Sequence, residues 1–316
     1  MPKERFSNQI SKPEQPFVLS EGEISKKFRV LTSEELEKLG LSKKPKSTER
    51  KTGKEVTIEQ AMEILGEDVL GPEAIEITFG FKPEEIPPIP FTIEDLERAK
   101  ELGQFLELRV DQTSEGKPLN MGNMFDMLQP EFTAQNQGRI LNSYGKSDSW
   151  YKNEDFLKDV PQVQWVLISK DIIPNSLSKN YLQQTEVIAD YIKNEVFKDK
   201  DLPDVYQEAL DEFESKKAGI QSILSSNWQE AAKQLSELKI NQLVRQLPVE
   251  NMYDLVMYFK NNKKRLLEGK YTWTYRRASS GGLVDVGRFA SAGAGVGGWA
   301  PGRVDGDLGV SFSRSH

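Results

Sequence analysis

The chain has 316 residues and a formal net charge of −7 at pH 7, and 37% of its residues are hydrophobic. Because it has no Cys, disulfides, thiol nucleophiles and thiolate metal sites are excluded. Its single His is the last residue of the sequence, His316, which argues against catalytic triads and metal sites built on histidine. The negative net charge argues against non-specific binding to nucleic acid or to an anionic membrane surface.

Residues 1–54 are polar and rich in Lys, Glu and Ser, and this composition predicts a disordered N-terminal arm. The opening sequence MPKERFSNQISKPEQPF has no apolar stretch of the kind found in a signal peptide. No run approaches the roughly 18 apolar residues that predict a membrane helix. We therefore expect a soluble, cytoplasmic chain that does not contact a membrane.

A small helical segment with a Pro-rich linker is predicted at 55–85. The stretch VTIEQAMEILGEDVLGPEAIEITFG (56–80) contains two short helical patterns. Thr57, with Gln60 three residues later, has the pattern of a capping box at the start of the first. The sequence KPEEIPPIPF (82–91) favours an extended backbone, because proline restricts both itself and the residue before it.

The next elements are predicted from their periodicity and from their end signals. A capped amphipathic helix is expected at 92–103, and a strand at 105–111. A short helix is expected at 121–130, ending at Pro130. The run VQWVLIS (163–169) is apolar on both sides of the pleat, which predicts a buried strand.

A predominantly helical region follows at about 179–269. Apolar residues recur there at helical spacing in four stretches: 181–197, from 203 onward, 227–247 and 252–267. Because the links between them are short, we expect these helices to pack as a bundle or to cover a neighbouring sheet. We interpret the region as a helical insertion into a larger domain.

The C-terminal tail differs from the rest of the chain both in its predicted secondary structure and in its amino-acid composition. Four short strands joined by Gly- and Ser-rich turns are predicted to form a small antiparallel sheet, at 271–275, 283–289, 293–299 and 307–314. After Lys270 the chain contains no Lys, Glu, Gln or Met. Codons of the form adenine-adenine-pyrimidine whose adenines are freely replaced cannot encode those four residue types. A gene end rich in G and C would give a similar composition, so both explanations stay open.

The tail sequence YTWTYRRASSGGLVDVGRF, followed by ASAGAGVGGW and LGVSFSRS, resembles the end of variable proteins of diversity-generating retroelements. These proteins occur in phages and in bacteria with reduced genomes. The stretches that begin at IPFTIEDLERAKELG and WYKNEDFLKDV are similar to the N-terminal half of the same family. The resemblance covers about 86–316. It implies an α+β chain with a C-type-lectin-like domain at 86–316 and a variable region at about 273–315.

The resemblance also implies a function. In that family a reverse transcriptase misincorporates opposite template adenine, and the product overwrites the 3′ end of the gene, so that exposed residues vary on a constant framework. The implied framework here is Trp273, Leu283, Val284, Val286, Phe289, Val296, Leu308, Gly309, Val310 and Phe312. The implied binding face, for an unknown protein or small-molecule ligand, is Asp285, Arg288, Ser291, Ala292, Ala294, Gly297, Gly298, Trp299, Arg303, Val304, Asp305 and Asp307.

The same sequence also contains residues that other kinds of function would use. The pairs Glu84/Glu85 and Asp305/Asp307 resemble acid–base or metal sites, but solvated charge explains them better, and we predict no enzyme, no metal and no cofactor. The GAGVGG stretch is followed by Trp299 and Pro301 rather than by a helix, so it does not predict a nucleotide loop. The run KNNKKR (260–265) is typical of a solvated helix end, not of specific nucleic-acid binding. The alternative function is a non-catalytic structural or assembly protein of phage origin that oligomerises through its helical region.

Overall fold

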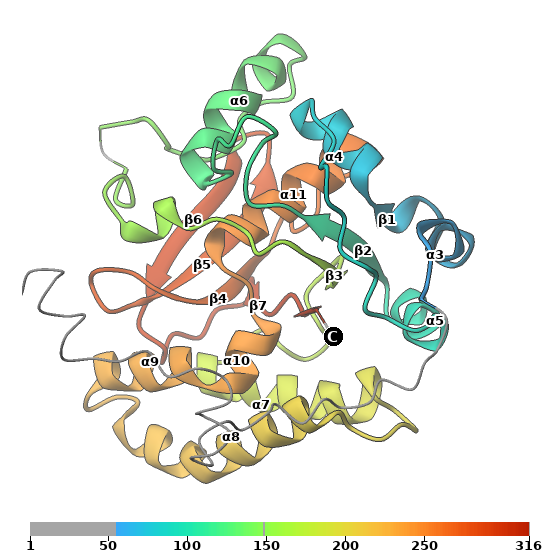
Figure 1. Cartoon of the computed structure of the whole chain (residues 1–316). Helices are drawn as coiled ribbons and strands as arrows, with labels where there is room; N and C mark the ends of the chain where they lie inside the picture. Colours follow the sequence, from blue (N-terminus) through green and yellow to red (C-terminus); the bar gives the residue numbers. More distant parts are fainter. Residues whose placement is uncertain (1–54, 148, 316) are drawn as a thin grey trace, which may run out of the picture. The chain divides into compact units, whose positions relative to one another are not determined.

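A computed structural model describes residues 55–147 and 149–315 (Figure 1). They belong to one compact unit, Lys54–His316, so the small helical segment predicted at 55–85 is part of the same unit as the rest. The predicted arm at 1–54 lies outside the described residues. The unit combines helices with two small sheets, and the α+β class is confirmed. Within the described ranges, no helix has the length and apolar character needed to span a membrane.

The first sheet has the strand order β1-β2-β3-β8. Its strands are β1 (Val69–Leu70), β2 (Gln104–Arg109), β3 (Gln164–Ser169) and β8 (Ser313–Arg314). β2 and β3 are antiparallel, β1 is parallel to β2, and β8 adds to β3 in the antiparallel sense. Every residue of β2 is buried, as expected for a strand covered on both faces.

Three short helices surround this sheet: α3 (Ile58–Leu65), α4 (Pro72–Phe79) and α5 (Ile93–Glu101). The predicted capping box at Thr57 and Gln60 is present, and Thr92 forms a second one with Asp95. The helix α6 (Met121–Ala134) does not end at Pro130 as predicted. It continues because its last turn buries Phe132 completely, with the ring 5.5 Å from that of Phe259, which offsets the hydrogen bond that proline cannot donate.

The second sheet is built from the tail and has the order β6-β5-β4-β7. Its strands are β4 (Tyr271–Arg277), β5 (Leu283–Ala290), β6 (Gly293–Trp299) and β7 (Leu308–Gly309). Three of the predicted strands are present and antiparallel to one another. The predicted fourth strand is corrected: 307–314 divides into β7, which lies parallel to β4, and β8, which joins the first sheet. The second sheet is therefore mixed rather than antiparallel.

The tail divides because the chain crosses from one sheet to the other between β7 and β8. Val310 and Phe312 are fully buried in the crossing segment. Their carbonyl oxygens accept hydrogen bonds from the backbone N–H groups of Ile173 and Ser169, each at 2.8 Å. The backbone of the crossing is thus satisfied by β3 and the segment after it, and this removes the need for a continuous strand.

The helical region separates into two parts with different cores. The first contains α7 (Tyr181–Tyr191), a π-helix (Ile192–Val196), α8 (Asp204–Ile223), α9 (Trp228–Glu237) and α10 (Lys239–Val244). These helices share one apolar cluster with Trp273, Leu283 and Leu308, and Figure 1 shows them as a layer beside the second sheet. The helix expected at 227–247 is interrupted at Leu238, whose backbone is extended (ψ 130°).

The second part is α11 (Pro248–Asn262), which lies in the other apolar cluster, together with the first sheet and Val284 and Val286 of β5. Almost every residue of its first three turns is buried. The guanidinium of Arg109, on β2, binds Asp254 of α11 through two hydrogen bonds of 2.9 and 2.7 Å. The same guanidinium lies 3.3 Å from a carboxylate oxygen of Glu250.

A pair of glycine substitutions tests the packing of the second sheet. A Cβ on Gly287 would meet the Lys270 carbonyl oxygen at 2.2 Å and the Tyr271 Cα at 2.5 Å. We expect Gly287→Ala to lower the free energy of unfolding by roughly 3 kcal/mol, because two strand backbones must separate. Gly219 lies exposed in α8 with nothing within 4 Å of the added carbon, so Gly219→Ala should stabilise by about 1 kcal/mol. Urea unfolding of both variants measures this, and equal effects would contradict the described sheet packing.

Candidate functional site

A cavity of about 510 Å³ lies beside β5 and β6, where the helical layer no longer covers the second sheet. It is lined by eight residues of the predicted binding face: Asp285, Arg288, Gly297, Gly298, Trp299, Arg303, Asp305 and Asp307. The remaining lining residues are Trp150, Tyr271, Val296 and Leu308. Two strands and the loop that follows them therefore bring most of the predicted residues together.

Four predicted residues do not line this cavity. Ser291 and Ala292 are exposed in the turn between β5 and β6, and Val304 is exposed outside the cavity. The placement of Ala294 on an exposed face is corrected, because it is only 1% exposed and packs in the apolar cluster around α11. Its backbone pairs with the segment around Leu141, which covers that end of β6.

Strand pairing sets the direction of the side chains around the cavity. Asp285 lies opposite Gly297 across β5 and β6. Because successive side chains alternate between faces, Asp285 points into the cavity while Val284 and Val286 point into the core. The carboxylate lies across β6 in the space that a side chain at 297 would need: a Cβ there would be 2.6 Å from both carboxylate oxygens.

Asp285 has unusual electrostatics for a lining residue. It is 2% exposed, and its Oδ2 atom has no hydrogen-bond partner. The pKa of its carboxyl is raised to about 7, mainly by burial; Arg303 acts in the opposite direction, and the nearby Asp307 and Asp305 contribute to the rise. The cavity floor therefore carries an acid that changes charge near neutral pH and offers an unused acceptor.

The rim of the cavity, in contrast, consists of paired charges. Arg288 forms an ion pair with Asp307, and Arg303 forms one with Asp305 at 2.7 Å. The Arg303 guanidinium also stacks 3.8 Å from the centre of the Trp299 ring. Since these charges neutralise one another, the unpaired group of the site is the carboxyl at its floor.

Sequence analysis did not find Trp150, which reaches the cavity from the other face of β6. Its indole N–H donates to the Val296 carbonyl at 2.9 Å, and its ring would lie 3.0 Å from a Cβ at Gly298. The sequence did contain a signal for this residue, the aromatic-rich stretch that begins at 149. Its irregular backbone gave no periodicity from which the direction of this ring could be deduced.

The cavity has several features of a ligand-binding site. It combines two tryptophan rings, an acceptor that lacks a donor and a rim of ion pairs, which are features that hold and orient a ligand. Among the residues that the structure describes, no group of three or more His, Cys, Asp or Glu side chains is placed to hold a metal ion.

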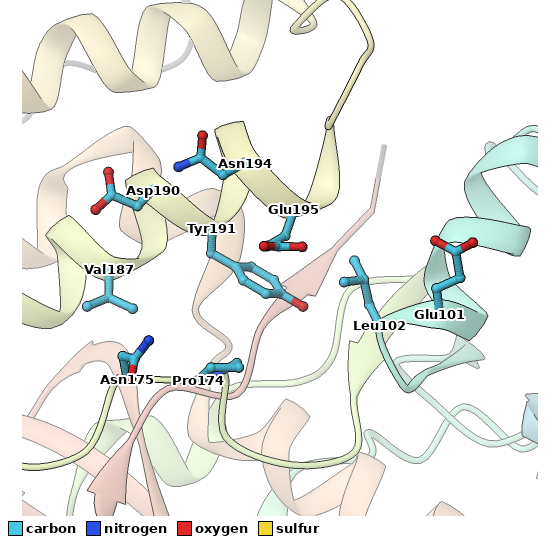
Figure 2. A pocket seen from close by; sticks show the side chains of 9 residues that line it. All are labelled: Glu101, Leu102, Pro174, Asn175, Val187, Asp190, Tyr191, Asn194 and Glu195. Atoms are coloured by element: carbon cyan, nitrogen blue, oxygen red, sulfur yellow. The ribbon is translucent and has the colours of Figure 1, made fainter.

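A second cavity, of about 490 Å³, lies between the end of α5 and the helix α7 with its π-helical extension. Figure 2 shows Val187 and Tyr191 projecting from α7 toward Pro174 and Asn175, with Leu102 beside them. Two of its three carboxylates, Glu101 and Glu195, pair with Arg98, at 2.7 and 2.9 Å. None of the predicted binding residues lines it, and its charged groups are largely neutralised, so the Asp285 cavity is the stronger candidate.

Comparisons with protein-family models, with curated proteins and with solved structures give no match for this chain.

The raised pKa of Asp285 predicts a pH-dependent stability. An acid whose pKa rises on folding binds its proton more tightly in the native state, so the free energy of unfolding falls as the pH rises from 3.8 to about 7. Asp285→Asn removes this titration. We expect the free energy of unfolding of the variant to exceed that of wild type by up to about 4 kcal/mol above pH 7. Near pH 3.8 the two values should be equal. Urea unfolding across this pH range measures the difference.

Asp305→Asn is the control for that experiment, because Asp305 lies at the rim and its pKa is lowered by the hydrogen bond from Arg303. It should show no gain in stability above pH 7. If the stability profiles of wild type and Asp285→Asn ran parallel over the whole range, the carboxyl would not be buried as described.

The contact between Asp285 and Gly297 predicts that the two positions are energetically coupled. Gly297→Ala should destabilise by about 2 kcal/mol, because its Cβ meets the carboxylate. The same change in an Asp285→Ala background should cost at least about 1 kcal/mol less. A double-mutant cycle measures the coupling, with Gly302→Ala as control because nothing lies within 4 Å of its added carbon. Additive effects would show that the two side-chain positions do not share this space.

Proposed function

We propose that this chain is a non-catalytic ligand-binding protein whose site is the Asp285 cavity. The observation that carries the proposal is the convergence of eight residues, chosen from sequence, on one cavity whose floor holds a buried carboxyl with one oxygen that has no hydrogen-bond partner. A volume of about 510 Å³ lies in the usual range for small-molecule sites, and it also admits a side chain of a protein partner.

The chemistry of the cavity favours a ligand with a hydrogen-bond donor or a cationic group. Asp285 supplies the free acceptor, and the faces of Trp150 and Trp299 supply apolar and π-rich surface. Binding of a cation would favour the ionised carboxylate over the protonated form that burial stabilises. The ligand should therefore bind more tightly above pH 7 than below it.

The proposal includes diversification of this site by adenine-directed reverse transcription, on a C-type-lectin-like framework. Two features support that reading. The amino-acid composition of the tail changes where the second sheet begins. The predicted residues that line the Asp285 cavity come from the side of β5 and β6 that faces this cavity and from the loop that follows β6. Two small sheets, closed by a C-terminal strand that pairs with β3, are compatible with the lectin-like architecture.

An assembly role for the helices receives less support. The most exposed large hydrophobic side chains among the described residues are Met62, Ile77, Ile86, Trp150, Val163, Trp299 and Val304. None of them lies on the helices α7 to α10. Their apolar residues pack instead against one another and against the tail strands, so these helices present no large apolar patch for a second copy.

Tryptophan fluorescence tests the binding proposal directly, since two tryptophans line the cavity. A panel of primary alkylamines and alkylguanidines should include members that change this fluorescence. Asp285→Asn should weaken the best of them at least about tenfold, as expected when a charge-assisted hydrogen bond is lost. Asp155→Asn, at an exposed ion pair outside the cavity, should leave binding unchanged. Equal affinity in both variants would exclude Asp285 as the ligand's partner.

Sequencing the DNA around the gene tests diversification separately. We expect a near-copy of the segment that encodes Trp273–Ser315, differing only where the copy has adenine, beside a reverse-transcriptase gene. Without such a copy the tail is an ordinary Gly-rich sheet, and the cavity is a fixed binding site.

A further inference from the structure

Arg245, at the end of α10, is a buried cation that no carboxylate of the described residues pairs with. It is 2% exposed. Its Nε donates to the side-chain oxygen of Asn241 at 3.0 Å, and its Nη2 to the Tyr181 carbonyl at 3.4 Å. Its guanidinium stacks 3.8 Å from the centre of the Tyr181 ring, and its Nη1 is buried with no hydrogen-bond partner. Burial lowers the pKa of Arg245 to about 10, which leaves it charged at neutral pH.

The other two deeply buried arginines have counter-charges. Arg109 binds Asp254 with two hydrogen bonds and lies near Glu250, while Arg314 is 3.4 Å from Asp95. Burying a charge is costly unless an opposite charge compensates it, and the fold supplies that compensation in both cases. The guanidinium of Arg245 has aromatic and neutral partners only, so it still lacks a negative charge.

Arg245 lines a separate cavity of about 210 Å³ between the first sheet, β4 and the α10–α11 junction. Its lining is polar: Gln162, Gln164, Gln242, Gln246, Tyr275 and Ser313 contribute amides and hydroxyls. Burial raises the pKa of Tyr275 to about 12, so its hydroxyl keeps the proton that it can donate. Gln162 and Gln242 are exposed, which opens the cavity to solvent.

One carboxylate, that of Glu250, lines the same cavity, but both of its oxygens are engaged. One lies 3.3 Å from Arg109, and the other accepts the backbone N–H of Leu247 at 2.8 Å. Because Asp254 and Glu250 already compensate Arg109, Arg245 is the charged residue of this lining that has no opposite charge beside it. A volume below the roughly 300 Å³ at which drug-sized sites begin fits a small anion.

We propose that this cavity binds a small oxyanion, a phosphate or a carboxylate, with the Arg245 guanidinium as its counter-charge. The free Nη1 group donates to the anion, and the lining amides and hydroxyls complete its coordination. The site is independent of the Asp285 cavity, because the two cavities share no lining residue.

Thermal unfolding with inorganic phosphate or acetate, each against chloride at equal ionic strength, tests the proposal. At about one hundredfold excess over its dissociation constant, the bound anion should raise the melting temperature by roughly 5–10 °C. The anion that acts identifies the class of the ligand. If neither anion raised the melting temperature beyond chloride, the proposal would be overturned.

Variants then locate the effect. Arg245→Met should abolish the response to the anion. Because that change can also impair folding, Gln242→Glu provides a second test: it adds a negative charge at the exposed rim and should weaken binding at least about tenfold. Gln221→Glu places the same charge on the exposed surface of α8, outside the cavity, and should leave the response unchanged. Equal weakening by both glutamates would mean that the anion binds elsewhere, and the assignment to Arg245 would fail.

Discussion

The fold depends on a buried ion pair between the helix α11 and the strand β2. α11 lies between β2 and β5, and Asp254 faces the core and is only 4% exposed. An isolated charge there would be strongly unfavourable, whereas a two-bond pair with Arg109 satisfies both ions. β2 and α11 therefore pack in the register that brings the two groups together. The Tyr253 hydroxyl, which donates to the Leu108 carbonyl at 3.1 Å, adds a neutral bond in the same register.

This register determines which part of the second sheet stays uncovered. α11 packs on Val284 and Val286, so the opposite face of β5 must be covered from elsewhere. The layer of α7 to α10 covers it at Trp273 and Leu283 but does not extend to Asp285. The candidate binding cavity is thus the part of the sheet that neither helical layer reaches, and the aspartate at its floor is buried by its own sheet and loops.

Sequence reasoning succeeded where the signal was local and failed where it was tertiary. The capping boxes at Thr57 and Thr92 and the strands β5 and β6 follow from short-range patterns. The continuation of α6 through Pro130 depends on a distant aromatic contact that no local pattern contains. The resemblance of the tail implied that Asp285 belongs to the binding face, but it could not show that the segment around Leu141 covers Ala294. The division of 307–314 into β7 and β8 likewise depends on partner strands far away in the sequence, β4 for β7 and β3 for β8.

Asp285 and Arg245 are both buried and each has an atom without a hydrogen-bond partner, but they differ in how each can relieve its charge. A carboxyl can take up a proton, and with a pKa of about 7 the floor of its cavity reaches neutrality without a ligand. A guanidinium cannot do so at physiological pH, so Arg245 stays charged in its polar cavity under all ordinary conditions. A cation entering the first cavity must therefore displace a proton, and its affinity follows pH. An anion entering the second meets a permanent charge, and its affinity depends on ionic strength and on its own ionisation instead.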